Sequence, residues 1–231
     1  MRIDEGYPPP NELRKNELET LQYIKDSSVF QSYYPTFTND ASLSYFQLQK
    51  ATSLNFASNL EVCLDHKSSK KGDAHIGLNI RTKDNRYEQV SYSLAICLKR
   101  GDRYRLLRRY HFDYAIPGIS TRQAHPVFHL QYAGELFGHL KALKIQHAHL
   151  DSWLSEPRLF FMPMTLAFLM NIVFKEFPDE SAVAVIERSE WRDLIRKNEK
   201  LLLVPYFRCC RNFINAINNP KLLTNDFYYG S

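Results

Sequence analysis

The chain has 231 residues and a mass of 27.1 kDa, and 44% of its residues are hydrophobic, 13% aromatic and 24% charged. These values are typical of globular proteins and exclude a disordered chain, a collagen-like chain and a disulfide scaffold. Thirty Lys and Arg against 25 Asp and Glu give a net charge of +5, which predicts a mildly basic single domain over residues 1–231 without selecting a partner.

The apolar segments and the cysteines bear on the cellular compartment. The most apolar stretch, residues 159–174, contains Pro163 and Asn171 and is shorter than the roughly 20 residues that cross a bilayer. Residues 1–10 lack the apolar segment of a secretion signal. The four cysteines show no C-x-x-C spacing and fit reduced thiols. We therefore expect a cytoplasmic protein that does not enter a membrane.

Residues 1–59 predict a helical lead. Asn11 follows a run of three prolines and is expected to be the N-cap of a first helix. The apolar positions with helical spacing in that helix are Leu18, Leu21 and Ile24. Residues 42–60, of mixed polarity, predict a second helix.

Residues 60–134 predict an antiparallel sheet of four or five strands. The clearest strand alternates apolar with small or polar residues over 89–98. An Arg-Gly-Asp turn signal and renewed alternation over 103–115 complete a hairpin. Residues 74–80 predict an earlier strand and residues 125–132 a later one. Short polar links between consecutive strands favour an antiparallel meander.

Residues 135–231 predict a helical part. Apolar side chains recur at i, i+3, i+4 and i+7 over 166–177 and predict a buried helix that Pro178 ends. Ser189 is expected to cap a further helix, and Pro205 to separate it from a final one. Because strands precede helices without alternating with them, the sequence predicts an α+β fold whose C-terminal helices pack on one face of the sheet.

Two predicted strands bring chemically active side chains to one face, since residues two apart in a strand share a face. The set on these two strands comprises Arg105, Arg109, His111, Asp113, His125, His129 and Gln131. We expect His111 to lie opposite His129, with Asp113 and Gln131 beside them. A solvated sheet face more often carries Thr, Ser, Lys and Glu, so this face is the candidate site.

The first interpretation of this face is acid–base chemistry on a phosphodiester. The expected catalytic residues are His111, Asp113, His129 and Gln131, in which the two imidazoles transfer protons and the carboxylate orients one of them. The residues expected to hold a phosphate are Arg105, Arg109, His125 and Arg158. The sequence leaves open whether the protein is an enzyme; if it is one, a nuclease-like phosphodiester hydrolase fits the set.

Two other interpretations stand beside the first. His111, Asp113 and His129 would chelate a divalent metal ion, but their spacing is not specific for one, and we predict neither a metal nor a cofactor. Alternatively, the histidines form hydrogen bonds within a buried polar network and Arg158 makes an internal salt bridge. The chain contains no phosphate-binding glycine loop, Rossmann fingerprint, serine elbow or zincin helix, which argues against an ATPase, a dehydrogenase or a common hydrolase.

The chain offers surfaces for two classes of partner. Residues 99–109 form the densest positive run, composed of Lys99, Arg100, Arg103, Arg105, Arg108 and Arg109. With Tyr104 and Tyr110 interleaved, this run suits a nucleic-acid backbone with stacked bases, and a solvated hairpin is the alternative. The tyrosine pairs at 33–34 and 228–229 suit a protein interface instead.

The order of four motifs provides a resemblance. They are His-Phe-Asp-Tyr at 111–114, His-Pro-Val-Phe-His-Leu-Gln at 125–131, Glu-Pro-Arg at 156–158 and Pro-Met at 163–164. Together they resemble uncharacterised bacterial proteins from mobile-element and phage-defence gene neighbourhoods, over roughly residues 85–180; the usual glycine pair stands here as Ala133-Gly134. The resemblance implies a cytoplasmic bacterial protein of a multi-gene system, with a protein partner from the same neighbourhood, and implies no activity.

Overall fold

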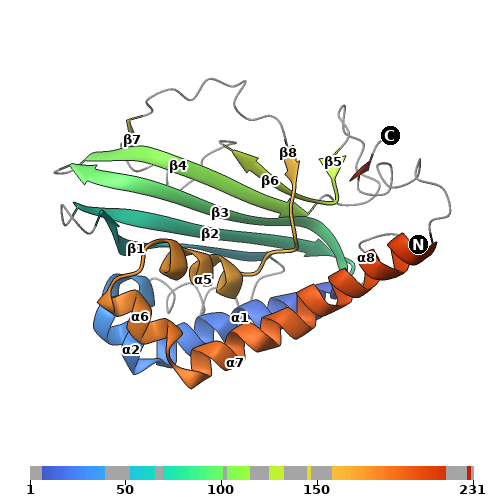
Figure 1. Ribbon diagram of the computed structural model, residues 1–231, viewed down its shortest axis with the longest axis horizontal. Helices are drawn as coiled ribbons and strands as arrows, with labels where there is room; N and C mark the ends of the chain where they lie inside the picture. Colours follow the sequence, from blue (N-terminus) through green and yellow to red (C-terminus); the bar gives the residue numbers. More distant parts are fainter. Residues whose placement is uncertain are drawn as a thin grey trace.

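An antiparallel β-sheet with helices over one of its faces forms the framework of the protein (Figure 1). The computed structural model describes residues 7–39, 53–65, 70–100, 103–114, 125–132, 145–146, 158–216 and 228–229. Within these residues the predicted α+β fold is confirmed.

The strands of the main sheet follow the chain order across the sheet. They are β1 (Ser53–Asp65), β2 (Lys70–Lys83), β3 (Arg86–Arg100), β4 (Arg103–Tyr114), β6 (Phe128–Tyr132) and β8 (Arg158–Phe160), each antiparallel to the next. The short strand β7 (Ile145–Gln146) pairs in parallel with β4. A separate pair consists of β5 (His125–Pro126) and β9 (Tyr228–Tyr229). The expected meander is therefore confirmed from β1 to β4 and continues with β6, while residues 125–126 of the predicted last strand belong to the separate pair.

The helices lie on one side of the sheet, with α5 next to the strands and α1 running beside α7 beneath it (Figure 1). They are α1 (Pro10–Asp26), α2 (Ser28–Tyr33), α5 (Leu166–Glu176), α6 (Glu180–Ile186), α7 (Ser189–Asn198), the π-helix η2 (Glu199–Leu203) and α8 (Val204–Ala216), and residues 35–39 are also helical. In the part of the chain that is described, none of the helices combines the length and apolar character needed to cross a membrane.

The core forms because alternate residues of the long strands β1 to β4 face the helices. One row runs straight across the sheet through Phe56, Leu78, Tyr92, Phe112 and Leu130, and it ends at Leu159, which is exposed on the edge strand. The predicted helix at 166–177 matches α5, which buries Leu169 and Val173 completely against this face. Phe177 takes the C-cap position of that helix and Pro178 follows it, as expected.

The sheet begins earlier than the sequence indicated. Residues 53–60 belong to β1, so the helix predicted over 42–60 is wrong there, while residues 42–52 lie outside the described part of the chain. The buried side chains of β1 are Leu54, Phe56, Ser58, Leu60 and Val62. They recur every second residue, which is the period of a strand, and the small polar Ser58 among them obscured that period. Strand β8 likewise falls inside the region 135–231 that was expected to be helical.

Three expected helix boundaries are also wrong. Helix α1 begins at Pro10 with Pro9 at its N-cap, because proline suits the first helical position, and Asn11 lies inside the helix. Ser189 is the first residue of α7 rather than its cap. Pro205 does not separate two helices, since α7, η2 and α8 follow one another without a break. The wide turn of the π-helix before Pro205 accommodates a residue without an N–H.

A buried carboxylate joins the helical layer to the sheet. Glu17 of α1 is fully buried, and its Oε1 accepts a hydrogen bond of 2.8 Å from the Tyr92 hydroxyl on β3. Its Oε2 lies 3.2 Å from the backbone N–H of Leu166, the first residue of α5. Burial raises the pKa of this carboxyl from 4.5 to about 8, even though both hydrogen bonds favour the ionised form. Glu17 therefore connects three elements while largely protonated at neutral pH.

Replacing this carboxyl tests its role through the pH dependence of stability. Because the folded state raises the pKa of Glu17, its contribution to the free energy of unfolding is complete below about pH 4.5 and is lost as the pH rises to about 8. Glu17→Gln cannot titrate at this position. Its free energy of unfolding, measured with urea, should therefore fall by a few kcal/mol less than that of wild type between about pH 4.5 and about pH 8. Glu12→Gln, at an exposed position of the same helix, should keep the wild-type slope. Equal slopes in wild type and Glu17→Gln would contradict the assignment.

Candidate functional site

The face of the sheet opposite the helices carries the polar side chains that the sequence singled out. We call it the polar face and define it by Ser91 and Ser93 of β3, Arg109, His111 and Asp113 of β4, and His129 and Gln131 of β6. Each is an alternate residue of its strand, so the alternation that turns Tyr92 and Phe112 toward the helices turns this set the other way. The polar face is the reverse side of the core.

A carboxylate–imidazole pair lies at its centre. Asp113 is directly opposite His129, and its Oδ2 lies 3.7 Å from the imidazole Nε2. The hydroxyl of Ser91, opposite Asp113 on the other side, donates a hydrogen bond to Oδ1. One carboxylate oxygen thus accepts a hydrogen bond from β3, and the other lies within ion-pair distance of the imidazole on β6. The His129 side chain is 5% exposed and that of Asp113 is 25% exposed, so solvent reaches the pair at the carboxylate.

The expected pairing of His111 with His129 is wrong. His111 lies opposite Gln131, and the partner of His129 is Asp113. The difference is a shift of two residues, which keeps every side chain on its face but changes its neighbour. Such a shift depends on the connection between β4 and β6, whose length and conformation strand periodicity does not specify.

His111, Gln131 and Arg109 surround the central pair. His111 is 8% exposed and lies between Ser93 and Gln131, and Arg109, 4% exposed, lies opposite Ala95 one row further along β4. The structure therefore brings four expected catalytic residues and one expected phosphate ligand together on the polar face. Arg158 pairs through its backbone with Gln131, in the same row as His111.

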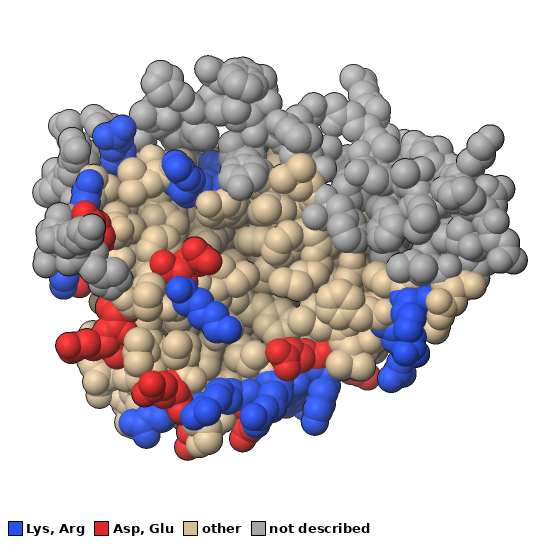
Figure 2. All heavy atoms as spheres, viewed as in Figure 1, with Lys and Arg blue, Asp and Glu red and all other residues tan. Residues whose placement is uncertain are grey.

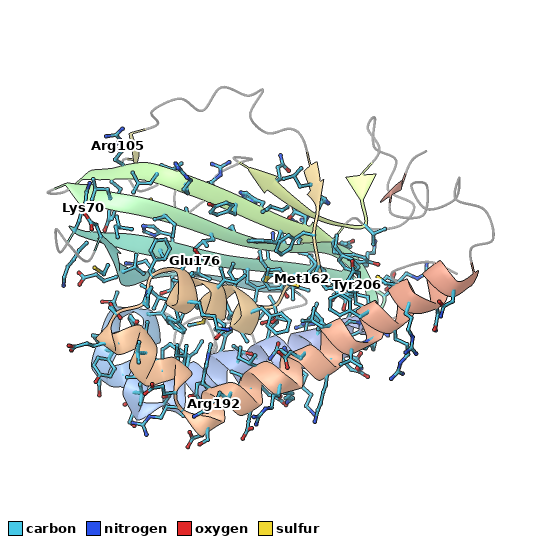
Figure 3. The ribbon with its side chains drawn as sticks, in the orientation of Figure 1. Lys70, Arg105, Met162, Glu176, Arg192 and Tyr206 are labelled. Atoms are coloured by element: carbon cyan, nitrogen blue, oxygen red, sulfur yellow. The ribbon has the colours of Figure 1, made fainter. Side chains whose placement is uncertain are left out.

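Two expected phosphate ligands lie elsewhere. A register shift between β3 and β4 leaves Leu107 as an extra residue, so Arg105 pairs with Leu98 and shares a face with it instead of with Arg109. Figure 3 also shows Arg105 at the end of β4 far from Met162, a residue that neighbours the Asp113–His129 pair. His125 belongs to the small sheet of β5 and β9, because the strand alternation breaks at Val127 before β6 begins.

The inner side of the pair is closed by aromatic rings. Tyr7 packs on Tyr114 with ring centroids 4.5 Å apart, and Tyr114 stacks on Phe128 at 5.3 Å. The cavity that these rings share with Asp113 and His129 measures about 10 Å³, which is about the space of one water molecule. A substrate has no room on this side and would have to approach from the exposed edge of Asp113.

Sequence reasoning missed Ser91 and a second polar cluster. The alternation over 89–98 already placed Ser91 on the polar face, but its bond to Asp113 became visible only with the register. In the second cluster the Tyr104 hydroxyl interacts with Asp73, and its ring meets that of His75 at a centroid distance of 5.4 Å. Burial raises the pKa of the nearby Cys97 thiol to about 12, which makes it a poor nucleophile at neutral pH.

The donor groups of the described residues do not form a metal centre. No three His, Cys, Asp or Glu side chains among them are grouped so as to hold a metal ion, and this includes His111, Asp113 and His129. The metal-chelation interpretation therefore lacks the geometry it needs. Acid–base chemistry and a buried polar network remain as interpretations of the polar face.

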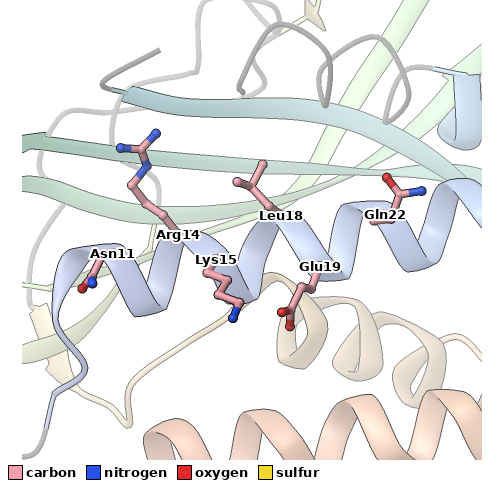
Figure 4. A pocket seen from close by; sticks show the side chains of 6 residues that line it. All are labelled: Asn11, Arg14, Lys15, Leu18, Glu19 and Gln22. Atoms are coloured by element: carbon pink, nitrogen blue, oxygen red, sulfur yellow. The ribbon is translucent and has the colours of Figure 1, made fainter. Parts of the chain in front are cut away.

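A separate hollow of about 420 Å³ runs along α1 (Figure 4). Its lining residues are Asn11, Arg14, Lys15, Leu18, Glu19 and Gln22. Figure 4 shows Arg14 and Leu18 pointing to one side of the helix and Lys15 and Glu19 to the other. Because these side chains diverge, the hollow lacks the convergent polar groups of a ligand pocket.

Comparison of the chain with protein-family models, with curated proteins and with solved structures finds no match. Function has to be argued from the site, since a fold by itself does not define an activity.

The contacts of Asp113 predict a measurable contribution to stability. Asp113→Ala removes the acceptor of the Ser91 hydroxyl and the partner of His129, both part-buried or buried, and should lower the free energy of unfolding by about 1–3 kcal/mol. Urea unfolding measures this change. Asp193→Ala removes a carboxylate from an exposed ion pair with Arg196 and should leave the midpoint nearly unchanged. Equal midpoints for the two variants would show that the contacts of Asp113 add nothing.

Proposed function

We propose that the polar face acts on phosphodiester bonds of RNA or DNA by acid–base catalysis. The observation that supports this proposal most is the Asp113–His129 pair, in which a carboxylate lies 3.7 Å from a buried imidazole, on the same sheet face as a second imidazole and an arginine. Histidine exchanges protons near neutral pH, and a guanidinium neutralises the non-bridging oxygens of a phosphate. These are the groups that cleavage of a phosphodiester requires.

The roles follow from the position of each group. Asp113 faces Nε2 of His129, so Nδ1 of that ring would accept the proton of the attacking hydroxyl or water. His111, one row away on β4, would donate a proton to the leaving oxygen, so that one imidazole gains a proton and the other loses one. Arg109 would hold the phosphate. It lies two residues before His111 on the same face of β4, a separation of about 7 Å along the strand.

Contact with the nucleic-acid backbone would use β4. Arg105 and Arg108 are exposed on this strand, whereas Arg109 is buried. We place the protein in the bacterial cytoplasm as a component of a multi-gene defence system on the strength of the motif order at 111–164 alone. That setting supplies nucleic acid as a substrate.

Loss of one imidazole tests the catalytic proposal. His129→Ala should lower the rate of cleavage of labelled single-stranded RNA, single-stranded DNA or duplex by about 10²- to 10⁴-fold, because a general acid or base contributes that much. His75→Ala removes an equally buried histidine from another strand of the same face and should retain the rate. The melting temperature of each variant is measured in parallel. Equal rates for His129→Ala and wild type, or cleavage of none of the three substrates, would refute the proposal.

Salt dependence tests the binding step separately. Two phosphate contacts from the exposed Arg105 and Arg108, which share a face of β4, predict a roughly sevenfold loss of affinity for single strands between about 50 and about 200 mM salt. Filter binding measures the slope, which Arg105→Ala should reduce by about one contact. Arg196→Ala, on the exposed side of α7, should keep the wild-type slope. No retention of any nucleic acid at low salt would exclude this function.

A second candidate function is a non-catalytic component of a multi-protein complex. The burial of His111, His129 and Arg109 favours it, because buried polar groups often serve a hydrogen-bond network that stabilises the fold. Under this function His129→Ala lowers the melting temperature while no cleavage is detected in any variant. The paired measurement of rate and melting temperature therefore separates the two candidates.

A further inference from the structure

The end of the helical layer presents an exposed ridge that the polar face does not use. We call it the α8 ridge and define it by Lys200 of η2 and by Val204, Phe207, Arg208 and Arg211 of α8. Phe207 and Arg208 are neighbours in the chain, and the other steps along the ridge are three or four residues. The whole set therefore shares one side of the helix. All are exposed, Val204 to 46% and Phe207 to 56%.

The other side of α8 is anchored to the sheet. Leu202 and Tyr206 are buried, and the Tyr206 ring meets that of Phe128 of β6 at a centroid distance of 5.6 Å. Figure 3 shows Tyr206 next to Met162 at this end of the sheet, and both pack into the same small cluster. The ridge is thus held on a fixed helix with its side chains turned away from the core.

The ridge carries positive charge that its own helix does not offset. Residues 200–216 contain no Asp or Glu, and the acidic residue nearest to them along the chain before Lys200 is Glu199, the first residue of η2. Helix α7 differs, because there Arg196 pairs with Asp193 and Lys197 pairs with Glu19 of α1. Figure 2 shows the Lys and Arg side chains along this edge of the molecule, with acidic side chains among them over α7. Among the described residues, Arg208 and Arg211 form no ion pair.

We infer that the α8 ridge binds an acidic amphipathic helix of a partner protein. From Lys200 to Arg211 the ridge is about 16 Å long, the length of three helical turns. Apolar side chains of the partner would cover Val204 and Phe207, and its carboxylates would meet Lys200, Arg208 and Arg211. Exposed aromatic and arginine side chains are the residues on which binding energy concentrates at interfaces.

Other occupants fit the ridge less well. A second copy in a two-fold arrangement would bring these cations against their own equivalents. A nucleic acid would neutralise the cations but leave Val204 uncovered. A membrane surface would gain little from two apolar side chains. The inference rests on the second candidate function and supplies it with a surface and a partner chemistry.

Fluorescence anisotropy with defined probes tests the inference. The probe is a labelled peptide of about 18 residues with Leu at i, i+3, i+4 and i+7 positions and Glu elsewhere, long enough for about five helical turns. Its controls are a scrambled peptide of the same composition, a Lys-for-Glu peptide, a single-stranded RNA and anionic phosphatidylserine vesicles. We expect wild-type protein to bind the acidic amphipathic peptide more tightly than any control.

The variants separate the apolar and charged contacts. Phe207→Ser and Arg211→Glu should each weaken peptide binding about tenfold or more, the scale of an interface hot spot. Val183→Ser removes an exposed apolar side chain from α6 and should bind as wild type does. All three positions are exposed, so the variants should keep the wild-type melting temperature.

Several results would overturn the inference. These are no binding of the acidic peptide, equal binding of the scrambled peptide, tighter binding of RNA or vesicles than of the peptide, or equal binding by Phe207→Ser and wild type. Co-purification of both wild type and Phe207→Ser with a partner would instead retain the second candidate function and assign its interface to another surface. Absence of any partner for wild type would reject that function itself.

Discussion

The antiparallel register between β3 and β4 determines what each face of the sheet contains. Pairing of Tyr92 with Phe112 completes the apolar row beneath the helices, and the adjacent pairing of Ser91 with Asp113 builds the site on the other side. Since side chains alternate between faces, a slip of one residue would expose the core and bury the charged groups against α5. The stability of the core and the composition of the polar face therefore depend on one set of backbone hydrogen bonds.

Each face of the sheet surrounds a carboxylate with a different environment. Glu17, on the helix side, is fully buried, and the absence of solvent raises its pKa so that a neutral acid meets Tyr92 and the start of α5. Asp113, on the polar face, retains a quarter of its side-chain surface and has a histidine and a serine as partners. The first arrangement suits a structural connection between layers, and the second suits a group that stays accessible to a ligand.

The sheet and the last helix divide the surface between two kinds of chemistry. The polar face concentrates His111, His129 and Arg109 where water is scarce, a setting in which electrostatic interactions strengthen. The α8 ridge instead displays Phe207 and arginines to solvent on a helix fixed by Tyr206. Because Tyr206 packs on Phe128, the residue next to His129, the two regions are joined through β6.

The sequence by itself determined the features that depend on local periodicity. Alternation over 89–98 and helical spacing over 166–177 specified β3 and α5, and the alternation over 103–115 and 125–132 assigned His111, Asp113 and His129 to one face. Each of these follows from a period of two or 3.6 residues within one segment.

The tertiary structure alone decided which residues became neighbours. The partner of His129 depends on how β6 docks along β4, and the displacement of Arg105 depends on the extra residue Leu107. The bond from Ser91 to Asp113 and the burial of Glu17 join residues that are distant in the chain. Such contacts arise from the packing of separate elements, and no short-range pattern in the chain encodes them.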